Sequence, residues 1–261
     1  MKTAMVAREP APGADPKAAA DRFTAAKLHA IYQITNAQLR TYPFAHVYVE
    51  NILPKAFFAE ARQNLPADEG YTVLVDSGRV GKGYSRARLS LFPTDLEKSK
   101  CTDEQREFWR QMFAAFGDAE FATTIYNRFR PQIEQRFAGK AGAKLSVRHE
   151  TFLMRDLETY SLGPHTDNPK KLVSVLLYLA PDNSRPELGT AVYLPKDRGF
   201  VCPGGPHHDF DKFDHVTTMP YAPNTLVAFA KSSTCFHGVE PLDRANSRRD
   251  IFFYDLKNDQ A

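Results

Sequence analysis

Apolar and polar positions divide the chain into a helical first half and a second half of short strands. In the first half, apolar residues recur at the three- and four-residue spacing of an amphipathic helix. Thr102, followed three residues later by Gln105, is typical of a capping box at a helix start. The predicted helices cover residues 21–40, 53–66, 102–118 and 119–137.

The second half consists of short β-type runs separated by turns rich in Gly and Pro. The runs cover residues 145–156, 171–180, 190–195, 224–230, 234–241 and 248–256, and residues 196–223 are predicted to form one long loop. No helix of crossover length separates the runs, which favours an antiparallel sandwich or barrel over a parallel doubly wound sheet.

We therefore predict one α+β domain at residues 19–261, with a mainly β core. Its helical part extends to about residue 143 and supports a β core at about 144–256. The first 18 residues are rich in Ala and Pro with scattered charges, so we expect a disordered leader there. An earlier strand is expected at 44–51 and a β-rich, Gly-punctuated segment at 71–92.

Composition narrows the class of protein. The 261 residues carry a formal net charge of +3 with a pI near 8.6, too mild for a nucleic-acid footprint. The only basic clusters are pairs, and we interpret Lys170–Lys171 as a solvated strand end. Cys101, Cys202 and Cys235 lack CxxC spacing, which favours a reducing cytoplasm over a disulfide framework. Neither a signal peptide nor a run of about 18 apolar residues is present, so we predict a cytoplasmic protein that binds neither membranes nor nucleic acids.

The stretch "SLGPHTDNPKK" contains the first candidate chemistry. On an extended segment, His165 and Asp167 project to the same side because side chains alternate. Downstream, His237 lies at the end of a short β-type run. Two histidines and one carboxylate on one face form the facial triad of non-haem Fe(II) sites, which leaves coordination positions open. An HxD pair alone is equally typical of a polar turn in which the aspartate caps a backbone amide.

Together with their neighbours, these residues resemble the prolyl 4-hydroxylase-like branch of the 2-oxoglutarate/Fe(II)-dependent dioxygenases. The resemblance lies in "YSLGPHTD", in "VSVLLYLA" followed by "LGTAVYLP", and in "FHGVEPLDRANSRRDIFFY", between about Val147 and Tyr254. It implies a double-stranded β-helix, or jelly roll, supported by N-terminal helices. It also implies that iron is held by the catalytic triad His165, Asp167 and His237.

The resemblance further implies a buried cation that binds the distal carboxylate of 2-oxoglutarate. Arginine suits this role because its fork bonds a carboxylate bidentately and stays charged when desolvated. The chain offers Arg248 and Arg249, which strand alternation places on opposite sides. The family's Arg-x-Ser pattern aligns with Arg248, although Asp250 replaces the serine. The predicted anchor is therefore Arg248.

Other polar residues are weaker candidates. Tyr160, Tyr178 and Thr190 are predicted to complete the cofactor pocket, and Arg155 to contact substrate. The two tyrosines could equally be structural, Tyr178 at the edge of the core and Tyr160 as a brace for the turn before His165. The loop from His207 to His215 contains clustered His and Asp residues, and we interpret it as a polar lid because flexible clusters rarely preorganise a metal site.

The resulting expectation is an Fe(II)- and 2-oxoglutarate-dependent oxygenase. It would use molecular oxygen to hydroxylate a C–H bond of a small molecule or exposed side chain, releasing succinate and CO2, with ascorbate as a candidate reductant. One alternative is a cupin-like metal-dependent isomerase or dioxygenase that does not use 2-oxoglutarate. A second alternative is a non-catalytic binding or sensing barrel.

Overall fold

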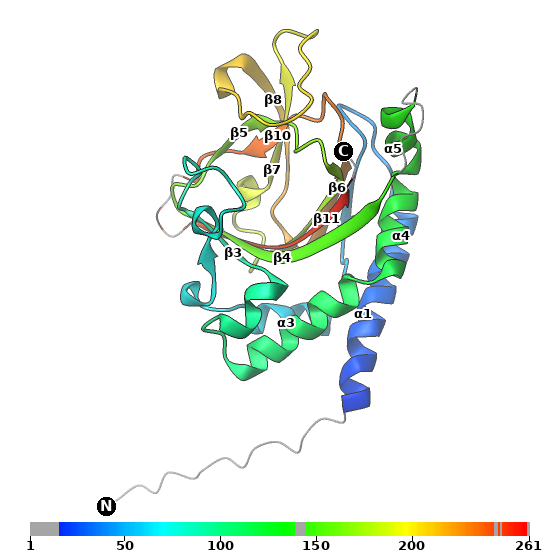
Figure 1. The fold of residues 1–261 in the computed structure, drawn as a ribbon, viewed down its shortest axis with the longest axis vertical. Coiled ribbons are helices and arrows are strands. Elements are labelled where there is room, and N and C mark those ends of the chain that lie inside the picture. Colours follow the sequence, from blue (N-terminus) through cyan, green and yellow to red (C-terminus); the bar gives the residue numbers. More distant parts are fainter. Residues whose placement is uncertain (1–15, 139–144, 243–244, 246, 260–261) are drawn as a thin grey trace, which may run out of the picture.

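The computed structural model describes residues 16–138, 145–242, 245 and 247–259 (Figure 1). The α-helices are α1 (Pro16–Asn36), α2 (Lys55–Gln63), α3 (Asp103–Phe116), α4 (Ala119–Arg128) and α5 (Arg130–Phe137). The strands are β1 (His46–Glu50), β2 (Thr72–Val73), β3 (Arg88–Leu91), β4 (Val147–Leu157), β5 (Leu162–His165), β6 (Lys171–Leu179), β7 (Thr190–Pro195), β8 (Phe213–Met219), β9 (Pro223–Ala230), β10 (His237–Val239) and β11 (Arg248–Asn258). Short 3-10 helices occur at Asp68–Gly70, Leu74–Ser77, Pro93–Lys98, Pro186–Leu188 and Phe210–Lys212.

The strands form two antiparallel sheets that enclose a common interior (Figure 1). The larger sheet has the order β1-β9-β6-β11-β4-β3-β2, and the smaller has the order β5-β10-β7-β8. Successive strands from β4 to β11 alternate between the sheets except at β7–β8, where a hairpin connects neighbours in the smaller one. This strand order is that of a jelly roll of eight strands, with β1, β2 and β3 added at the edges of the larger sheet. The predicted double-stranded β-helix is confirmed.

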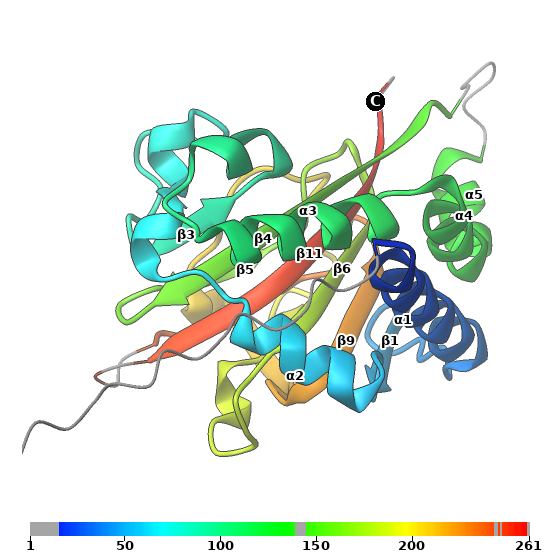
Figure 2. The ribbon, with the colours of Figure 1, turned by 90° about the horizontal axis from the view of Figure 1, so that it is seen from below.

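The two faces of the larger sheet have different partners. On β11, Phe252 faces outward and stacks on Trp109 and Phe113 of α3, with ring centroids 6.3 and 6.0 Å apart. Helices α1, α2 and α3 cover this outer face (Figure 2). The next residue, Phe253, faces inward and stacks on Phe152 at 5.1 Å. Because side chains alternate along a strand, this packing fixes which β11 residues enter the interior.

The helical half begins and divides differently from the prediction. Helix α1 starts at Pro16 and so includes the last three residues of the predicted leader, whereas residues 1–15 lie outside the described part. The helix predicted at 119–137 is two helices that meet at Phe129. Pro131 lies in the first turn of α5, where its missing N–H and fixed φ favour a new helix start. The capping box at Thr102 and Gln105 is present as predicted.

The long loop predicted at 196–223 contains a strand. Residues Phe213–Met219 form β8, which pairs with β7 at the edge of the smaller sheet. Its fully buried side chains are Phe213 and Met219 at the two ends, and the middle is polar except for the half-buried Val216. A half-exposed edge strand of this kind carries too weak an apolar alternation to be separated from a polar loop by sequence.

Two further observations concern the helices and the cysteines. Within the described ranges, no helix is both long and apolar enough to cross a bilayer. Cys101, Cys202 and Cys235 are unpaired and buried.

The stack between β11 and α3 gives a first prediction. We expect Phe252→Ala to lower the free energy of unfolding by roughly 3–5 kcal/mol, because it leaves a cavity against Trp109. Urea denaturation followed by circular dichroism measures this change. Leu28→Ala, at a side chain on α1 that is 48% exposed, is the control and should cost less than about 1 kcal/mol. Equal losses in both variants would contradict the assigned orientation of β11.

Candidate functional site

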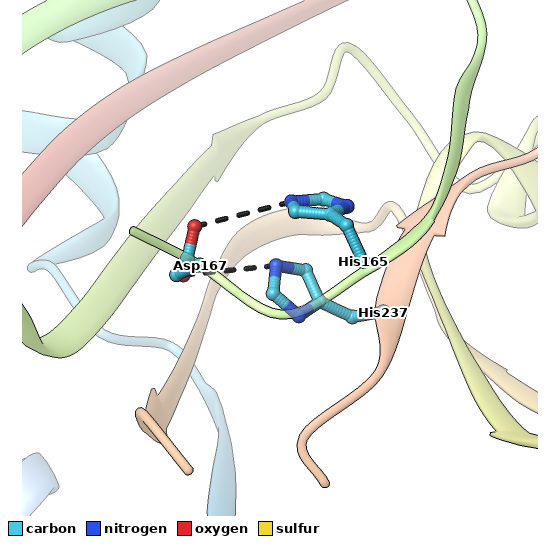
Figure 3. A group of neighbouring side chains, drawn as sticks. All are labelled: His165, Asp167 and His237. Carbon is cyan, nitrogen blue, oxygen red and sulfur yellow. Dashed lines mark ion pairs between the residues drawn. The ribbon is translucent and has the colours of Figure 1, made fainter. Parts of the chain in front are cut away.

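His165, Asp167 and His237 lie together at one end of the jelly roll (Figure 3). His165 ends β5 and His237 begins β10, and the two are directly opposite in the antiparallel pair. Their rings therefore lie side by side, with centroids 4.4 Å apart. The Asp167 carboxylate lies 3.9 Å from His165 Nε2 and 3.7 Å from His237 Nε2. All three potential ligand atoms are within 4.8 Å of one another and all three residues are buried.

The backbone fixes the orientation of both imidazoles. His165 Nδ1 is 3.0 Å from the Gly163 carbonyl, and His237 Nδ1 is 2.9 Å from the Cys235 carbonyl. Because a carbonyl only accepts, each Nδ1 must carry the proton, and the Nε2 lone pairs face Asp167. Burial lowers the pKa of both histidines, further assisted at His165 by the neighbouring His237. Neutral imidazoles with aligned Nε2 atoms are the form that binds a metal ion.

Asp167 is held in its ionised form by two neighbours on β6. Ser174 Oγ donates a hydrogen bond of 2.7 Å to its carboxylate, and Lys171 Nζ lies 3.1 Å away. Burial opposes ionisation, but the Lys171 ammonium and the hydrogen bond from Ser174 outweigh it and hold the pKa of Asp167 below its usual value. Lys171 also pairs with Asp255 at 3.0 Å. The interpretation of Lys171 as part of a solvated strand end is therefore wrong, because its side chain turns into the interior.

The triad opens onto a cavity of about 540 Å³ between the two sheets. Its floor consists of inward-facing residues of β4, β6 and β11, including Phe152, Leu176 and Phe253. Thr190 of β7 and Arg249 of β11 also line it. The metal-ligand candidates and a buried arginine therefore share one enclosed space.

Arg249, and not Arg248, is the arginine that faces this cavity. Arg249 is 1% exposed, and its Nε and Nη1 atoms have no hydrogen-bond partner. Its nearest carboxylate is Asp156, 3.7 Å from Nε, and Asp156 already accepts two bonds of 2.6 and 2.9 Å from Arg88. Arg248 lies on the outward side of β11, where its side chain is 43% exposed and its Nε donates to Asp250 at 2.8 Å. The choice of Arg248 is thus wrong by one position in the alternation.

Arg155 also lies on the wrong side of its strand to contact a substrate. Its neighbour Met154 lines the cavity, so Arg155 points to the outer face of β4. There it is fully buried and donates bonds of 2.6 Å to both Asp250 and Asp68. The predicted substrate contact is wrong, and Arg155 instead belongs to a buried ion-pair network between the sheet and the segment before β2.

The three remaining cofactor candidates lie at different depths. Thr190 lines the cavity, and its Oγ1 and N–H both bond the Tyr178 hydroxyl, at 2.6 and 2.9 Å. Tyr178 is buried behind Thr190, with its ring 5.8 Å from the Arg249 guanidinium carbon. Tyr160 is buried beneath Arg88, at 4.1 Å, and its hydroxyl bonds that of Tyr84 at 3.0 Å. Tyr160 therefore supports the site from behind.

The loop after β7 reaches the site through one histidine. The His207 ring lies 4.8 Å from that of His165 and lines the cavity, whereas His215 on β8 bonds Thr218. Across the described ranges, the triad is the one group of three or more His, Cys, Asp or Glu side chains arranged to hold a metal. The clustered His and Asp residues of the loop thus do not form a second centre.

Sequence reasoning missed the residues that support the site from other strands. Asp156 and Arg88 hold the end of the cavity that contains Arg249, and Ser174 and Lys171 hold Asp167. Alternation along β3 and β4 could have placed Arg88 and Asp156 inward once one inward residue was known. Lys171 and Ser174 are three residues apart on β6, and they face inward together only because the β6–β11 register is irregular near Lys171. The Arg88–Asp156 pair joins residues 68 apart in the chain, and no local pattern reports it, whereas Ser174 and Lys171 lie seven and four residues from Asp167.

Comparison with known proteins gives similarities only among solved structures; no protein-family model and no curated protein sequence matches the chain. A Trichoplax adhaerens prolyl hydroxylase, solved with a hypoxia-inducible-factor peptide, is 12% identical, with 92% of each chain covered and a TM-score of 0.49. A Pseudomonas putida prolyl 4-hydroxylase is 15% identical, covering 90% of this chain and 98% of its own, with a TM-score of 0.43. HygX from Streptomyces hygroscopicus, solved with nickel and 2-oxoglutarate, is 12% identical, covering 82% and 83%, also with a TM-score of 0.43. The sequence identities and TM-scores are low, so these similarities support no conclusion about a reaction.

The triad gives a second prediction. We expect His165→Ala and His237→Ala each to weaken binding of a divalent metal by about 100-fold or more, because each removes an aligned Nε2 ligand. Titration with Co(II), followed by its absorption bands and by calorimetry, measures the affinity. His215→Ala is the matched control and should bind as the wild type does. A loss of affinity in the control alone would move the metal centre to the side chains around His215 on β8.

Proposed function

We propose that this protein is an Fe(II)- and 2-oxoglutarate-dependent oxygenase. The observation that carries the proposal is the presence, in one buried cavity, of a two-histidine, one-carboxylate triad and an arginine with unpartnered nitrogens. A metal that takes three protein ligands and a cosubstrate that takes a buried cation both fit this arrangement.

The triad fits the metal because its donors are ready to bind. The two Nε2 atoms and the Asp167 carboxylate converge, and Ser174 and the two backbone carbonyls hold them in place. Three protein ligands on one side leave the opposite side open toward the cavity. His165, His237 and Asp167 would therefore hold Fe(II).

Arg249 fits the distal carboxylate of 2-oxoglutarate. A buried guanidinium with two unpartnered N–H groups costs several kcal/mol unless an anion neutralises it. Asp156 is 3.7 Å away and is itself neutralised by Arg88, so it compensates Arg249 only in part. Thr190, beside Arg249 on the cavity wall, offers a hydroxyl to the same carboxylate.

Bound iron and 2-oxoglutarate would together supply the oxidation: oxygen is reduced, the cosubstrate loses CO2 to become succinate, and a substrate C–H bond becomes an alcohol. The chain's own residues bind and orient these groups. Phe229, whose ring lies 4.4 Å from that of His237, and the apolar floor exclude water. The substrate would be a small molecule or an exposed side chain, with ascorbate as a candidate reductant.

The buried charge of Arg249 separates this proposal from its alternatives. A cupin-like enzyme without 2-oxoglutarate has no use for an unpartnered arginine inside the barrel. A non-catalytic barrel has no reason to keep three convergent side chains that are ready to bind a metal, two neutral histidines and one ionised aspartate. Cytoplasmic location and the absence of nucleic-acid and membrane partners stay predictions from composition.

Turnover is the direct test of the proposed reaction. With Fe(II), ascorbate and 2-oxoglutarate, we expect the wild type to release succinate even without substrate, and His165→Ala to lose at least about 100-fold of this rate. Mass spectrometry of succinate measures it, with His215→Ala as the control. If the iron-loaded wild type neither binds nor turns over 2-oxoglutarate, the proposed function fails.

A fourth prediction separates the two arginines. We expect Arg249→Ala to weaken binding of 2-oxoglutarate by about 100-fold and leave metal binding unchanged, because a charged bidentate contact is lost. Arg248→Ala, on the outer side of the same strand, is the matched control and should change it less than about threefold. Calorimetry on the Zn(II)-loaded protein gives both affinities. The reverse result would mean that the register of β11 is shifted by one residue.

A further inference from the structure

Positive side chains line the cavity well beyond the arginine that would bind 2-oxoglutarate. In the described part of the lining, seven Lys and Arg side chains face only three carboxylates. Two of the seven, Arg88 and Arg249, lie at the Asp156 end. The other five are Arg79, Arg148, Lys170, Lys171 and Lys257, and they lie along the ends of β4, β6 and β11 and at the cavity mouth.

The proposed occupants leave these five charges in excess. Iron's two charges are balanced by Asp167 and by the carboxylate of 2-oxoglutarate that binds the metal. At the other end, Arg88 and Arg249 are balanced by Asp156 and the distal carboxylate. The five remaining cations face only Glu150, Asp255 and Asp259, so two positive charges have no counterpart. This inference thus rests on the proposed function.

The individual contacts show that these carboxylates are shared. Glu150 accepts from Arg79 at 2.7 Å and also pairs with Lys257. Asp255 lies 3.0 Å from Lys171 and 3.7 Å from Lys257. Lys257 in turn lies between Glu150 and Asp255, so these side chains form one shared network and not separate ion pairs.

Two of the cations have room to take an additional partner. Arg148 donates through Nε to Asp259, and its side chain remains 45% exposed at the mouth of the cavity. The neighbouring Lys170 is exposed, and its ammonium pairs with no carboxylate of the described residues. An anion entering here would meet a guanidinium and two ammonium groups at the mouth of the cavity.

We propose that the substrate is a small molecule with an anionic group, a carboxylate or a phosphate, that binds between Arg148, Lys170 and Lys257. The cavity of about 540 Å³ is of the size that holds a small ligand beside the cosubstrate. The anionic group at the mouth would leave the rest of the substrate directed inward, toward the open side of the triad. The basic group thus selects the substrate and fixes which end reaches the metal.

The test measures anion binding without turnover. Zn(II)-loaded protein is saturated with N-oxalylglycine, an unreactive analogue of 2-oxoglutarate, and titrated separately with inorganic phosphate and with acetate while the melting temperature is followed. We expect saturable stabilisation in the millimolar range by at least one anion, beyond that of NaCl at equal ionic strength. The stronger of the two anions identifies the class of anionic group.

Charge-neutral and charge-retaining variants make the test specific. We expect Arg148→Gln with Lys257→Gln to raise the apparent Kd for the anion about tenfold or more, whereas Arg148→Lys with Lys257→Arg retains binding. Arg130→Gln removes an equal charge from exposed helix α5 and should have no effect. If the double variant melts without cooperativity, Arg148→Gln alone, at its exposed side chain, replaces it.

Two outcomes have different meanings. If N-oxalylglycine itself does not stabilise the metal-loaded wild type, the proposed function fails, and this inference fails with it whatever the anion titration gives. If N-oxalylglycine binds but neither anion exceeds the NaCl effect, or the glutamine variants bind as the wild type does, the basic group is not a substrate site. Either of the last two results overturns this inference alone.

Discussion

The orientation of β11 between α3 and the interior is the constraint on which the site depends. Phe252 is held outward against Trp109 and Phe113, and alternation then turns Arg249, Phe253 and Asp255 inward. A shift of one residue would put Asp250 and Tyr254 in the cavity and remove the buried cation. The position of the buried cation that we propose to bind the cosubstrate is therefore set by apolar packing on the opposite face of the sheet.

Two fully buried arginines on neighbouring strands differ in how their charges are compensated. Arg155 is satisfied by two carboxylates and lies against the Tyr71 ring at 4.4 Å, so its charge is neutralised within the fold. Arg249 keeps two unpartnered nitrogens, and its nearest acid is neutralised by another arginine. Since an uncompensated buried charge destabilises a protein, its retention at the cavity wall argues for a ligand that completes it.

The sequence carried enough information for the fold and for the grouping of His165, Asp167 and His237, but not for the side of β11 that faces inward. Short antiparallel runs without crossover helices specify a sandwich, and the HxD pair with a later histidine specifies the triad. On β11, however, Ile251 and Phe253 on one side are as apolar as Phe252 and Tyr254 on the other. Hydrophobicity cannot choose between such sides. The stack of Phe252 on Trp109 and Phe113 decides it, together with the Asp250–Arg155 pair, and no local pattern reveals either contact.

The two histidines of the triad are positioned by backbone pairing between short strands, not by apolar packing on a sheet face. Strands β5 and β10 have four and three residues, yet their pairing sets His165 directly opposite His237. Close backbone approach makes this pairing possible: a Cβ at Gly238 would lie 2.4 Å from the Leu162 carbonyl oxygen. The loop that carries His207 is tied to the same place, since the His208 N–H donates to the Pro164 carbonyl at 2.9 Å. Small residues and backbone hydrogen bonds, rather than a large apolar core, thus hold the ligand side of the cavity in register.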